Sequence, residues 1–360
     1  MVLLFQYLDI IYHECTENHV HSMYNVPATL DTNFSVNKSA SHVVKKTLIQ
    51  AIVQRENLGQ RCSAREVNSI ADLKPHKNSA CPNNEKWIKV LRNNTADNSE
   101  ITIVSVGCNK GDDLVRSIGF WSQKSEFSVS RYRKTSLLFF PKQNKRACPI
   151  EKHQPFSFKS NELHVRAYCI EPMPSNFNLL QTVMTDMGYI GPIKLIQAAV
   201  SSVSGKSPFP NAEVGKESMG LGLNKNNKYP NVEVDVISLD EFVHNEKLVK
   251  IDYLTIDTEG NDMKALIGCI KTLASGIIRY LEFEYHSVGR WAQSDLQDLI
   301  DILDQLNFDC YWTLNSGNLL RLTGCWHDSY YRERTWSNIG CINRKETETH
   351  LFMQKNAGFA

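Results

Sequence analysis

Several familiar features are absent from this sequence, and each absence excludes a class of protein. The 360-residue chain has ten cysteines but no C-x-x-C pair, which argues against a zinc site or a thioredoxin-like redox motif. The formal net charge is only +1, so charge alone predicts no binding to nucleic acid or to a membrane surface. The chain also has neither a G-x-G-x-x-G motif nor a Walker P-loop, which makes a nicotinamide-dependent dehydrogenase a poor hypothesis.

The N-terminal segment carries no firm targeting or membrane signal. Residues 1–12 are apolar but lack a basic n-region, and His13 and Glu14 end this run before it could span a bilayer. We interpret residues 1–80 as a poorly defined polar extension with one plausible helix over 42–55. The alternative is the remnant of an anchor or signal that starts upstream. The compartment stays open between the cytoplasm and the secretory pathway.

The cysteines are scattered along the chain, and their redox state is open. Cys169 and Cys269 stand in apolar runs and are most simply small core residues. Four others stand in polar, loop-like surroundings and could form disulfides if the chain is exported: Cys81, Cys148, Cys325 and Cys341.

From residue 81 onwards, apolar segments alternate between strand-like and helical patterns. Strands are predicted at 101–106, 164–170, 194–200, 234–239, 253–256 and 277–283. Helices are predicted at 85–92, 112–118, 175–187, 261–273 and 294–306, and a β-hairpin at 308–314 and 318–323. This order predicts a mostly parallel sheet that ends in an antiparallel strand.

We place one globular domain at 81–345, followed by a C-terminal tail at 346–360. Two polar stretches inside the domain, 121–160 and 203–231, are predicted to be long inserted loops, which are usually functional or disordered. Trp326 and Trp336 are assigned to a structured cap beyond the hairpin. Packing is the main interpretation of both tryptophans, and stacking on a sugar is the alternative.

A glycine-containing loop follows the first predicted strand and precedes a helix. It reads Gly107-Cys108-Asn109-Lys110-Gly111. Glycine permits a tight turn and a close approach of a ligand, and the helix offers free N–H groups. A glycine-rich turn without a ligand explains this pattern about equally well. Glu171 ends the next strand, where it could accept hydrogen bonds from both hydroxyls of a ribose or simply be a surface charge.

Acidic residues also follow two later strands. Asp257 and Glu259 stand two residues apart, and Glu282, Glu284 and His286 continue the next strand with the same spacing. Residues two apart on a strand share a face, and ligands of α/β sheets bind at the carboxyl ends of the strands. We therefore predict a substrate pocket with a proton acceptor. Salt-bridged charges at the end of a sheet are the alternative.

Three segments around these acids resemble the FkbM family of S-adenosylmethionine-dependent methyltransferases. They are Ile237 to Phe242, Ile251 to Gly260 with its Ile-Asp-x-Glu-Gly ending, and Met263 to Gly268 with its Leu-x-Gly ending. The G-x-N-x-G loop and the strand end at 198–201 are also similar to the family pattern. The resemblance spans about residues 101–285, and the Ile-Asp-x-Glu-Gly part is its most specific element.

The resemblance implies an α/β, class I methyltransferase-like (Rossmann-like) fold, with a mostly parallel sheet, helices on both faces and a C-terminal antiparallel hairpin. It implies S-adenosylmethionine as the cofactor and no metal. One departure stands at Ser105, where the family usually has an acid, and Asp112 is the candidate to compensate. By position, the implied cofactor contacts are Ser105, Gly107, Cys108, Asn109, Gly111, Glu171, Pro172, Ala198 and Asp257.

The activity implied is O-methylation of a hydroxyl on a sugar or another small acceptor, with the two inserted loops covering or shaping the acceptor site. The expected catalytic residues are Asp257, Glu259, Glu284 and His286, among which His286 and Asp257 are the candidates for the general base. The partner is a small-molecule or glycan acceptor rather than nucleic acid, and the oligomeric state is open. The alternative is a non-catalytic binding or adaptor protein that retains the fold.

Overall fold

The structure is a computed structural model that describes residues 62–66, 81, 83–143, 163–223, 228–327, 330 and 336–358. The predicted helix at 42–55, and Cys148, lie outside the described residues. Among the described residues, no helix is both long enough and apolar enough to cross a membrane.

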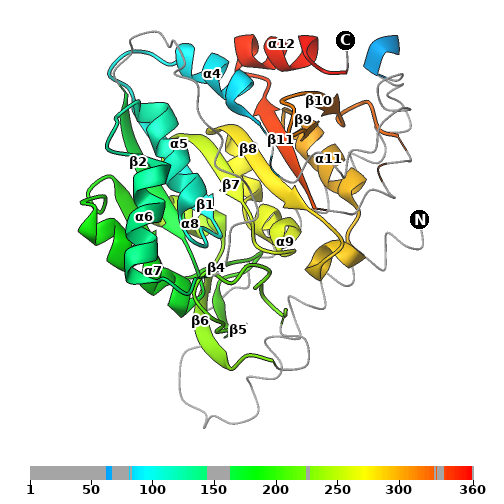
Figure 1. The fold of residues 1–360 in the computed structure, drawn as a ribbon. Helices are drawn as coiled ribbons and strands as arrows, with labels where there is room; N and C mark the ends of the chain where they lie inside the picture. The colour runs from blue at the N-terminus through cyan, green and yellow to red at the C-terminus, as the bar shows by residue number, and fades with distance from the viewer. Residues whose placement is uncertain are drawn as a thin grey trace.

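An eight-stranded sheet forms the centre of the molecule, with strand order β3-β2-β1-β7-β8-β11-β9-β10 (Figure 1). The strands from β3 to β8 in this order run parallel, whereas β11 is antiparallel to both of its neighbours and β10 is antiparallel to β9. The prediction of a mostly parallel sheet with an antiparallel C-terminal hairpin is thus confirmed. The strands are β1 Glu100–Val106, β2 His164–Ile170, β3 Ile193–Ile196, β7 Ile251–Ile256, β8 Ile278–Tyr285, β9 Phe308–Thr313, β10 Leu319–Arg321 and β11 Ser337–Asn343.

Helices cover both faces of this sheet because successive strand residues point to opposite sides. In β1, Ile101 and Ile103 join one hydrophobic cluster, whereas Val104 and Val106 join the other. The first cluster includes side chains of α4 Glu85–Asn93, α5 Asp112–Ser122, α6 Val129–Phe139, α7 Pro174–Asp186 and α12 Thr347–Lys355. The second includes side chains of α8 Leu239–Asn245, α9 Asp262–Ile267, α10 Ile270–Ser275, the 3-10 helix Gly289–Gln293 and α11 Leu296–Gln305.

A second, three-stranded sheet lies beside the ends of the parallel strands (Figure 1). Its strands are β4 Ala199–Val200, β5 Gly205–Pro210 and β6 Asn231–Ile237, in the order β4-β6-β5. The single strand predicted at 194–200 is therefore wrong, because it divides into β3 and β4 of different sheets. The predicted loop at 203–231 contains β5, whose two prolines are tolerated because β5 is an edge strand.

Other predicted boundaries shift for local reasons. The helix predicted at 261–273 divides at Gly268, where an added Cβ would lie 2.3 Å from the carbonyl oxygen of Ser201. The stretch 121–160 includes helix α6, and the tail after 346 includes α12, which packs on α4. Ser337 and Asn338 belong to β11 inside the central sheet rather than to a cap beyond the hairpin.

Three disulfides join described cysteines: Cys62–Cys325, Cys108–Cys169 and Cys310–Cys341. Cys81 is also disulfide-bonded, and Cys269 is free and buried. Cys169 is a buried core residue, as predicted, and in addition it is bridged to Cys108 of the glycine loop, because β2 pairs with β1 in a register that brings the two together. Bridged cysteines of this number are typical of oxidising compartments.

Candidate active site

The glycine loop joins the ends of three strands. The N–H of Gly107 donates to the carbonyl of Ile170 at the end of β2 (2.8 Å), and the N–H of Asp257 donates to the carbonyl of Val106 (2.9 Å). Gly107 has a φ of +79°, and a Cβ there would lie 1.7 Å from the carbonyl oxygen of Asp257. Only glycine fits, because the backbone after β7 passes directly against this position.

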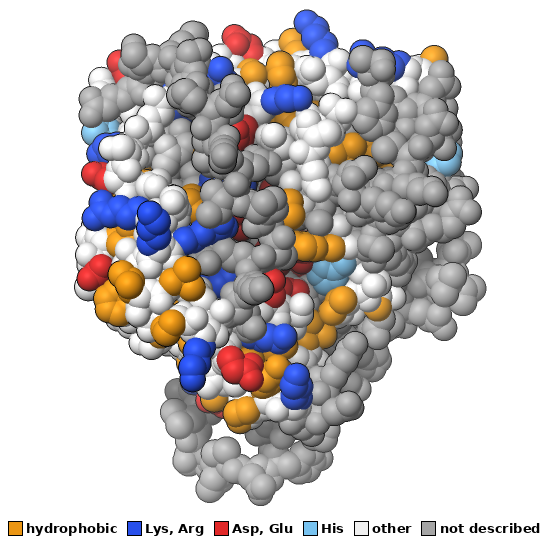
Figure 2. Space-filling model, viewed as in Figure 1, with side chains coloured by type: hydrophobic (Ala, Val, Ile, Leu, Met, Phe, Trp, Pro, Cys, Tyr) orange, Lys and Arg blue, Asp and Glu red, His pale blue; other side chains and the backbone are white. Residues whose placement is uncertain are grey.

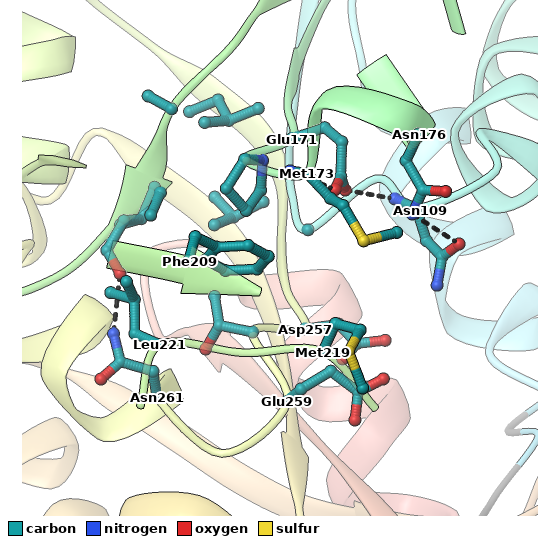
Figure 3. Close-up of a pocket in the computed structure, with 18 of the residues that line it drawn as sticks. Asn109, Glu171, Met173, Asn176, Phe209, Met219, Leu221, Asp257, Glu259 and Asn261 are labelled. Carbon is teal, nitrogen blue, oxygen red and sulfur yellow. Dashed lines mark hydrogen bonds between the residues drawn. The ribbon is translucent and has the colours of Figure 1, made fainter. Parts of the chain in front are cut away.

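A buried polar network then fixes the loop to β2 and α7. Glu171 accepts the N–H of Asn109 (2.8 Å) and the N–H of Met173 (3.0 Å) on its two carboxylate oxygens (Figure 3). The side-chain oxygen of Asn109 accepts from the amide of Asn176 (3.2 Å), whose own oxygen accepts the N–H of Gly215 (2.7 Å). Burial raises the pKa of Glu171 to about 7, although these hydrogen bonds favour the ionised form.

These residues border a cavity, here called the edge cavity, between the carboxyl ends of β1, β2 and β7 and the small sheet (Figure 3). Six of the predicted cofactor contacts line it: Gly107, Asn109, Glu171, Pro172, Ala198 and Asp257. Glu259 and several residues that the sequence did not suggest also line it, including Met173, Asn176, Phe209, Met219, Leu221 and Asn261. Its wall is therefore acidic on one side and apolar on the other.

The residues of the edge cavity that the sequence analysis did not predict stand in segments with a weak sequence pattern. Phe209 comes from β5, whose alternating polar residues and prolines resemble a loop, and Met219 and Leu221 follow in the same stretch. Asn176 could have been noticed as a polar residue one helical turn after Pro172, at the start of a helix that faces the strand ends.

A second cavity of about 590 Å³, here called the large cavity, adjoins the first and lies along one face of β1, β7 and β8. Ser105 and Cys108 line this cavity and not the edge cavity, whereas Gly111 lines neither. A Cβ on Gly111 would lie 2.7 Å from Tyr132 and from Leu180, so this glycine permits the packing of α5 on its neighbours. Both cavities share the walls at Val106, Gly107, Asn109, Asp257 and Glu259.

Near the middle of the face seen in Figure 2, acidic side chains lie beside a histidine. In the large cavity, the carboxyl groups of Asp257 and Glu284 are hydrogen-bonded to each other, which requires a proton on one of them. Burial, followed by the charge of Glu284, raises the pKa of Asp257 well above its usual value. Burial and the neighbouring acids likewise raise the pKa of Glu284. The two groups therefore titrate as a pair.

His286 stands next to this pair in a defined tautomer. Its Nδ1 accepts the N–H of Val288 (3.0 Å), so the proton of the neutral ring is on Nε2. Nε2 lies 3.1 Å from a carboxylate oxygen of Glu284, and burial lowers the pKa of His286. Nε2 makes no hydrogen bond with the described residues, and because Nδ1 already accepts from Val288, the neutral ring has no free lone pair with which to act as a base.

Glu259, Glu284 and His286 also place possible metal-ligand atoms within 4.8 Å of one another. A metal ion on Nε2 would have to displace the proton that the tautomer places there. Glu259 has a φ of +56° and accepts the N–H of Ser218 (2.7 Å), so its backbone is held in a strained conformation at the junction of the two cavities.

The two tryptophans that the sequence analysis assigned to a cap, Trp326 and Trp336, have different surroundings. Trp326 packs against the hydrophobic cluster and stacks edge-on against Tyr330, with ring centroids 5.4 Å apart. Trp336 is 39% exposed, lines the large cavity and hydrogen-bonds to Glu284. Packing therefore explains the first tryptophan, whereas the second contributes to the wall of the site.

Comparisons with known proteins agree with the sequence motifs. Residues 150–310 match the family model of the methyltransferase FkbM domain, a stretch that starts after the glycine loop and extends beyond the motifs at 237–268. No curated protein matches the chain.

Several solved structures are distantly similar. The FkbM methyltransferase of Methylobacillus flagellatus has a TM-score of 0.41 and 13% sequence identity. The similarity covers 85% of this chain and 61% of that protein's chain. An O-methyltransferase from Bacillus cereus, solved with S-adenosylhomocysteine, has a TM-score of 0.30 and 7% identity over 91% of this chain and 95% of its own. At these values the likeness is too weak to assign an activity. The family match covers the motifs at 237–268, so this part of the chain is similar to the methyltransferase FkbM domain.

Proposed function

We propose that this protein is an S-adenosylmethionine-dependent methyltransferase that methylates a hydroxyl of a sugar or another small acceptor. The observation that carries the proposal is the meeting of two cavities at Gly107 and Asp257. Methyl transfer is an in-line displacement and needs its donor and acceptor in adjoining sites that open onto each other. The edge cavity is the site for the cofactor, and the large cavity is the site for the acceptor.

The walls of the edge cavity fit the proposed cofactor. Each oxygen of Glu171 accepts one backbone N–H, which leaves lone pairs for the two hydroxyls of a ribose. Met173, Phe209 and Leu221 provide an apolar surface for an adenine ring. Burial raises the pKa of Asp257 and of Glu259, and the positive charge of a bound sulfonium would favour their ionised forms.

The reaction needs one proton acceptor beyond the cofactor, which supplies an activated methyl group when bound. The Asp257–Glu284 pair shares one proton, and it can accept a second proton when its other carboxyl is ionised. With the cofactor bound as methyl donor, this pair would take the proton of the acceptor hydroxyl as that hydroxyl is methylated. His286, whose Nδ1 accepts the N–H of Val288, has no free lone pair in this tautomer and is not the base itself.

Ser105, which stands where the family usually has an acid, is the residue that favours the alternative of a non-catalytic adaptor. The Ser105 side chain is buried and lines the large cavity only. Its replacement of an acid therefore removes no acidic wall from the edge cavity, and Glu171 remains in place there.

The test is methyl transfer from radiolabelled S-adenosylmethionine to a panel of sugars by wild-type protein, Glu284→Gln and, as a matched control, Glu233→Gln. Glu233 is exposed on β6, and Glu284 lines only the large cavity. Loss of a general base should lower kcat by roughly 10²–10⁴-fold in Glu284→Gln, with unchanged affinity for S-adenosylhomocysteine. Turnover by Glu284→Gln at the wild-type rate would contradict the role of the pair, and absence of any transfer by cofactor-bound wild-type protein would favour the adaptor.

A further inference from the structure

The large cavity contains a second polar cluster that the methyl-transfer chemistry does not use. The side-chain amide of Asn84 donates to the Tyr253 hydroxyl oxygen (2.9 Å) and to Oε2 of Glu282 (3.1 Å). The same Oε2 accepts the hydroxyl of Tyr280 (3.0 Å), which in turn accepts the indole N–H of Trp87 (3.0 Å). Two residues, Asn84 and Tyr280, therefore fix the orientation of the Glu282 carboxyl group.

This arrangement leaves hydrogen-bonding capacity directed at the cavity. No described residue hydrogen-bonds to Oε1 of Glu282, and none accepts the hydroxyl hydrogen of Tyr253. Both side chains line the large cavity and are only 9% and 5% exposed, respectively. A free acceptor and a free donor that line the same cavity together match a hydroxyl group, which both donates and accepts.

The strand geometry sets the distance between this cluster and the reacting site. Glu282 and Glu284 are two residues apart on β8 and both line the large cavity, so their Cα atoms are separated by about 7 Å. A molecule with one hydroxyl at Glu284 therefore reaches the cluster with a second group about 7 Å away, which is the scale of a sugar ring with its substituents.

The charges around the large cavity disfavour an anionic acceptor. Its lining lysine and arginines each pair with an acid in the described part of the chain: Lys110 with Glu217, Arg116 with Glu85 and Arg133 with Asp112. The groups that face the proposed acceptor are instead the carboxyls of Asp257, Glu282 and Glu284. A phosphate or carboxylate would be buried against these acids, and the cation that acts on Glu282, Arg116, is already paired with Glu85.

We propose that Asn84, Tyr253 and Glu282 form a second recognition point for an uncharged, polyhydroxylated acceptor such as a neutral glycoside. One acceptor hydroxyl lies at the Asp257–Glu284 pair and is methylated, and another binds at Glu282 and Tyr253. This inference rests on the proposed function, because it takes the large cavity as the acceptor site.

The test measures binding rather than turnover. Saturation-transfer NMR is recorded for the full chain, with and without S-adenosylhomocysteine, using the methyl glycosides of glucose, galactose, mannose and fucose. Glucose 6-phosphate and glucuronic acid serve as anionic counterparts. The proteins are wild type, Tyr253→Phe, Glu282→Gln and the control Glu233→Gln.

At least one neutral glycoside should bind to the wild-type protein. The two cavity variants, Tyr253→Phe and Glu282→Gln, should each lower the affinity for this glycoside about tenfold, which corresponds to the loss of one hydrogen bond to a charged or buried group. The control should bind as wild type does, and unchanged S-adenosylhomocysteine affinity will show that the variants are folded. Equal glycoside affinity in wild type and both cavity variants, binding of the anionic sugars as tight as that of the neutral ones, or no binding of any neutral glycoside would each overturn the proposal. If S-adenosylhomocysteine alone fails to bind, the proposed function fails, and the glycoside measurements without it still decide the subsite.

Discussion

The contact between the glycine loop and the backbone after β7 gives a sharp prediction for Gly107→Ala. The added Cβ would lie 1.7 Å from the carbonyl oxygen of Asp257, far inside any van der Waals distance, and the neighbouring atom is backbone. Gly107 also has a φ of +79°, which is unfavourable for alanine. The substitution must therefore push β1 and β7 apart at the point where the two cavities meet.

Gly188→Ala is a matched control for the backbone strain. Its φ of +72° is similar, but a Cβ there meets nothing within 4 Å. The left-handed conformation alone costs an alanine roughly 1–2 kcal/mol, and overpacking typically adds about 1–3 kcal/mol. We expect Gly188→Ala to lower the free energy of unfolding by about 1 kcal/mol and Gly107→Ala by about 2–5 kcal/mol.

Urea unfolding of both variants, followed by titration with S-adenosylhomocysteine, checks this prediction. Gly107→Ala should weaken cofactor binding as well as stability, since Gly107 lines both cavities. Gly188→Ala should bind as wild type does. If the two variants lose the same stability and both bind normally, the close approach of the loop to Asp257 is not what holds the site together.

Two further predictions concern pH and disulfides. Burial raises the pKa of Glu171 from 4.5 to about 7, so the folded protein holds this proton more tightly than the unfolded chain does. The stabilisation by the protonated carboxyl is fully present below pH 4.5 and is lost as the pH rises through 7. The free energy of unfolding should fall by about 3 kcal/mol over this range. Urea unfolding of the cofactor-free protein between pH 5 and pH 8 should show this decline, and Glu171→Gln should flatten it; an equal slope in the variant would contradict the assignment. Replacing the buried Cys310–Cys341 disulfide by two alanines should cost about 3 kcal/mol, because the bridge closes a loop with a sequence separation of 31 residues. A thermal unfolding midpoint that does not change would show that this bridge is not formed in solution.

The sequence predicted the parallel part of the fold because its strands are buried on both faces. Apolar runs such as 101–106 and 251–256 stand out from their surroundings for that reason, and the acids after them mark the edge of the sheet. The same runs led to Gly107, Asn109, Glu171 and Asp257, all of which line the edge cavity.

What the sequence could not predict depends on long-range packing. Strand β11 inserts between β8 and β9, and nothing local in 337–343 distinguishes it from a cap. Phe209 reaches the edge cavity from β5, a half-exposed edge strand with two prolines and a weak apolar pattern. The tautomer of His286 depends on one hydrogen bond from Val288, so the absence of a free lone pair on the ring is visible only in three dimensions.

Calorimetric titration of the purified protein with S-adenosylhomocysteine, alongside Glu171→Ala, tests the central claim most directly. We predict one binding site in the wild-type protein and a loss of affinity of tenfold or more in Glu171→Ala, since this carboxylate both faces the edge cavity and holds Asn109 in place. Both proteins should show a cooperative unfolding transition, which confirms that they are folded. No binding by folded wild-type protein, or equal binding by Glu171→Ala, would contradict the assignment of the edge cavity to the cofactor.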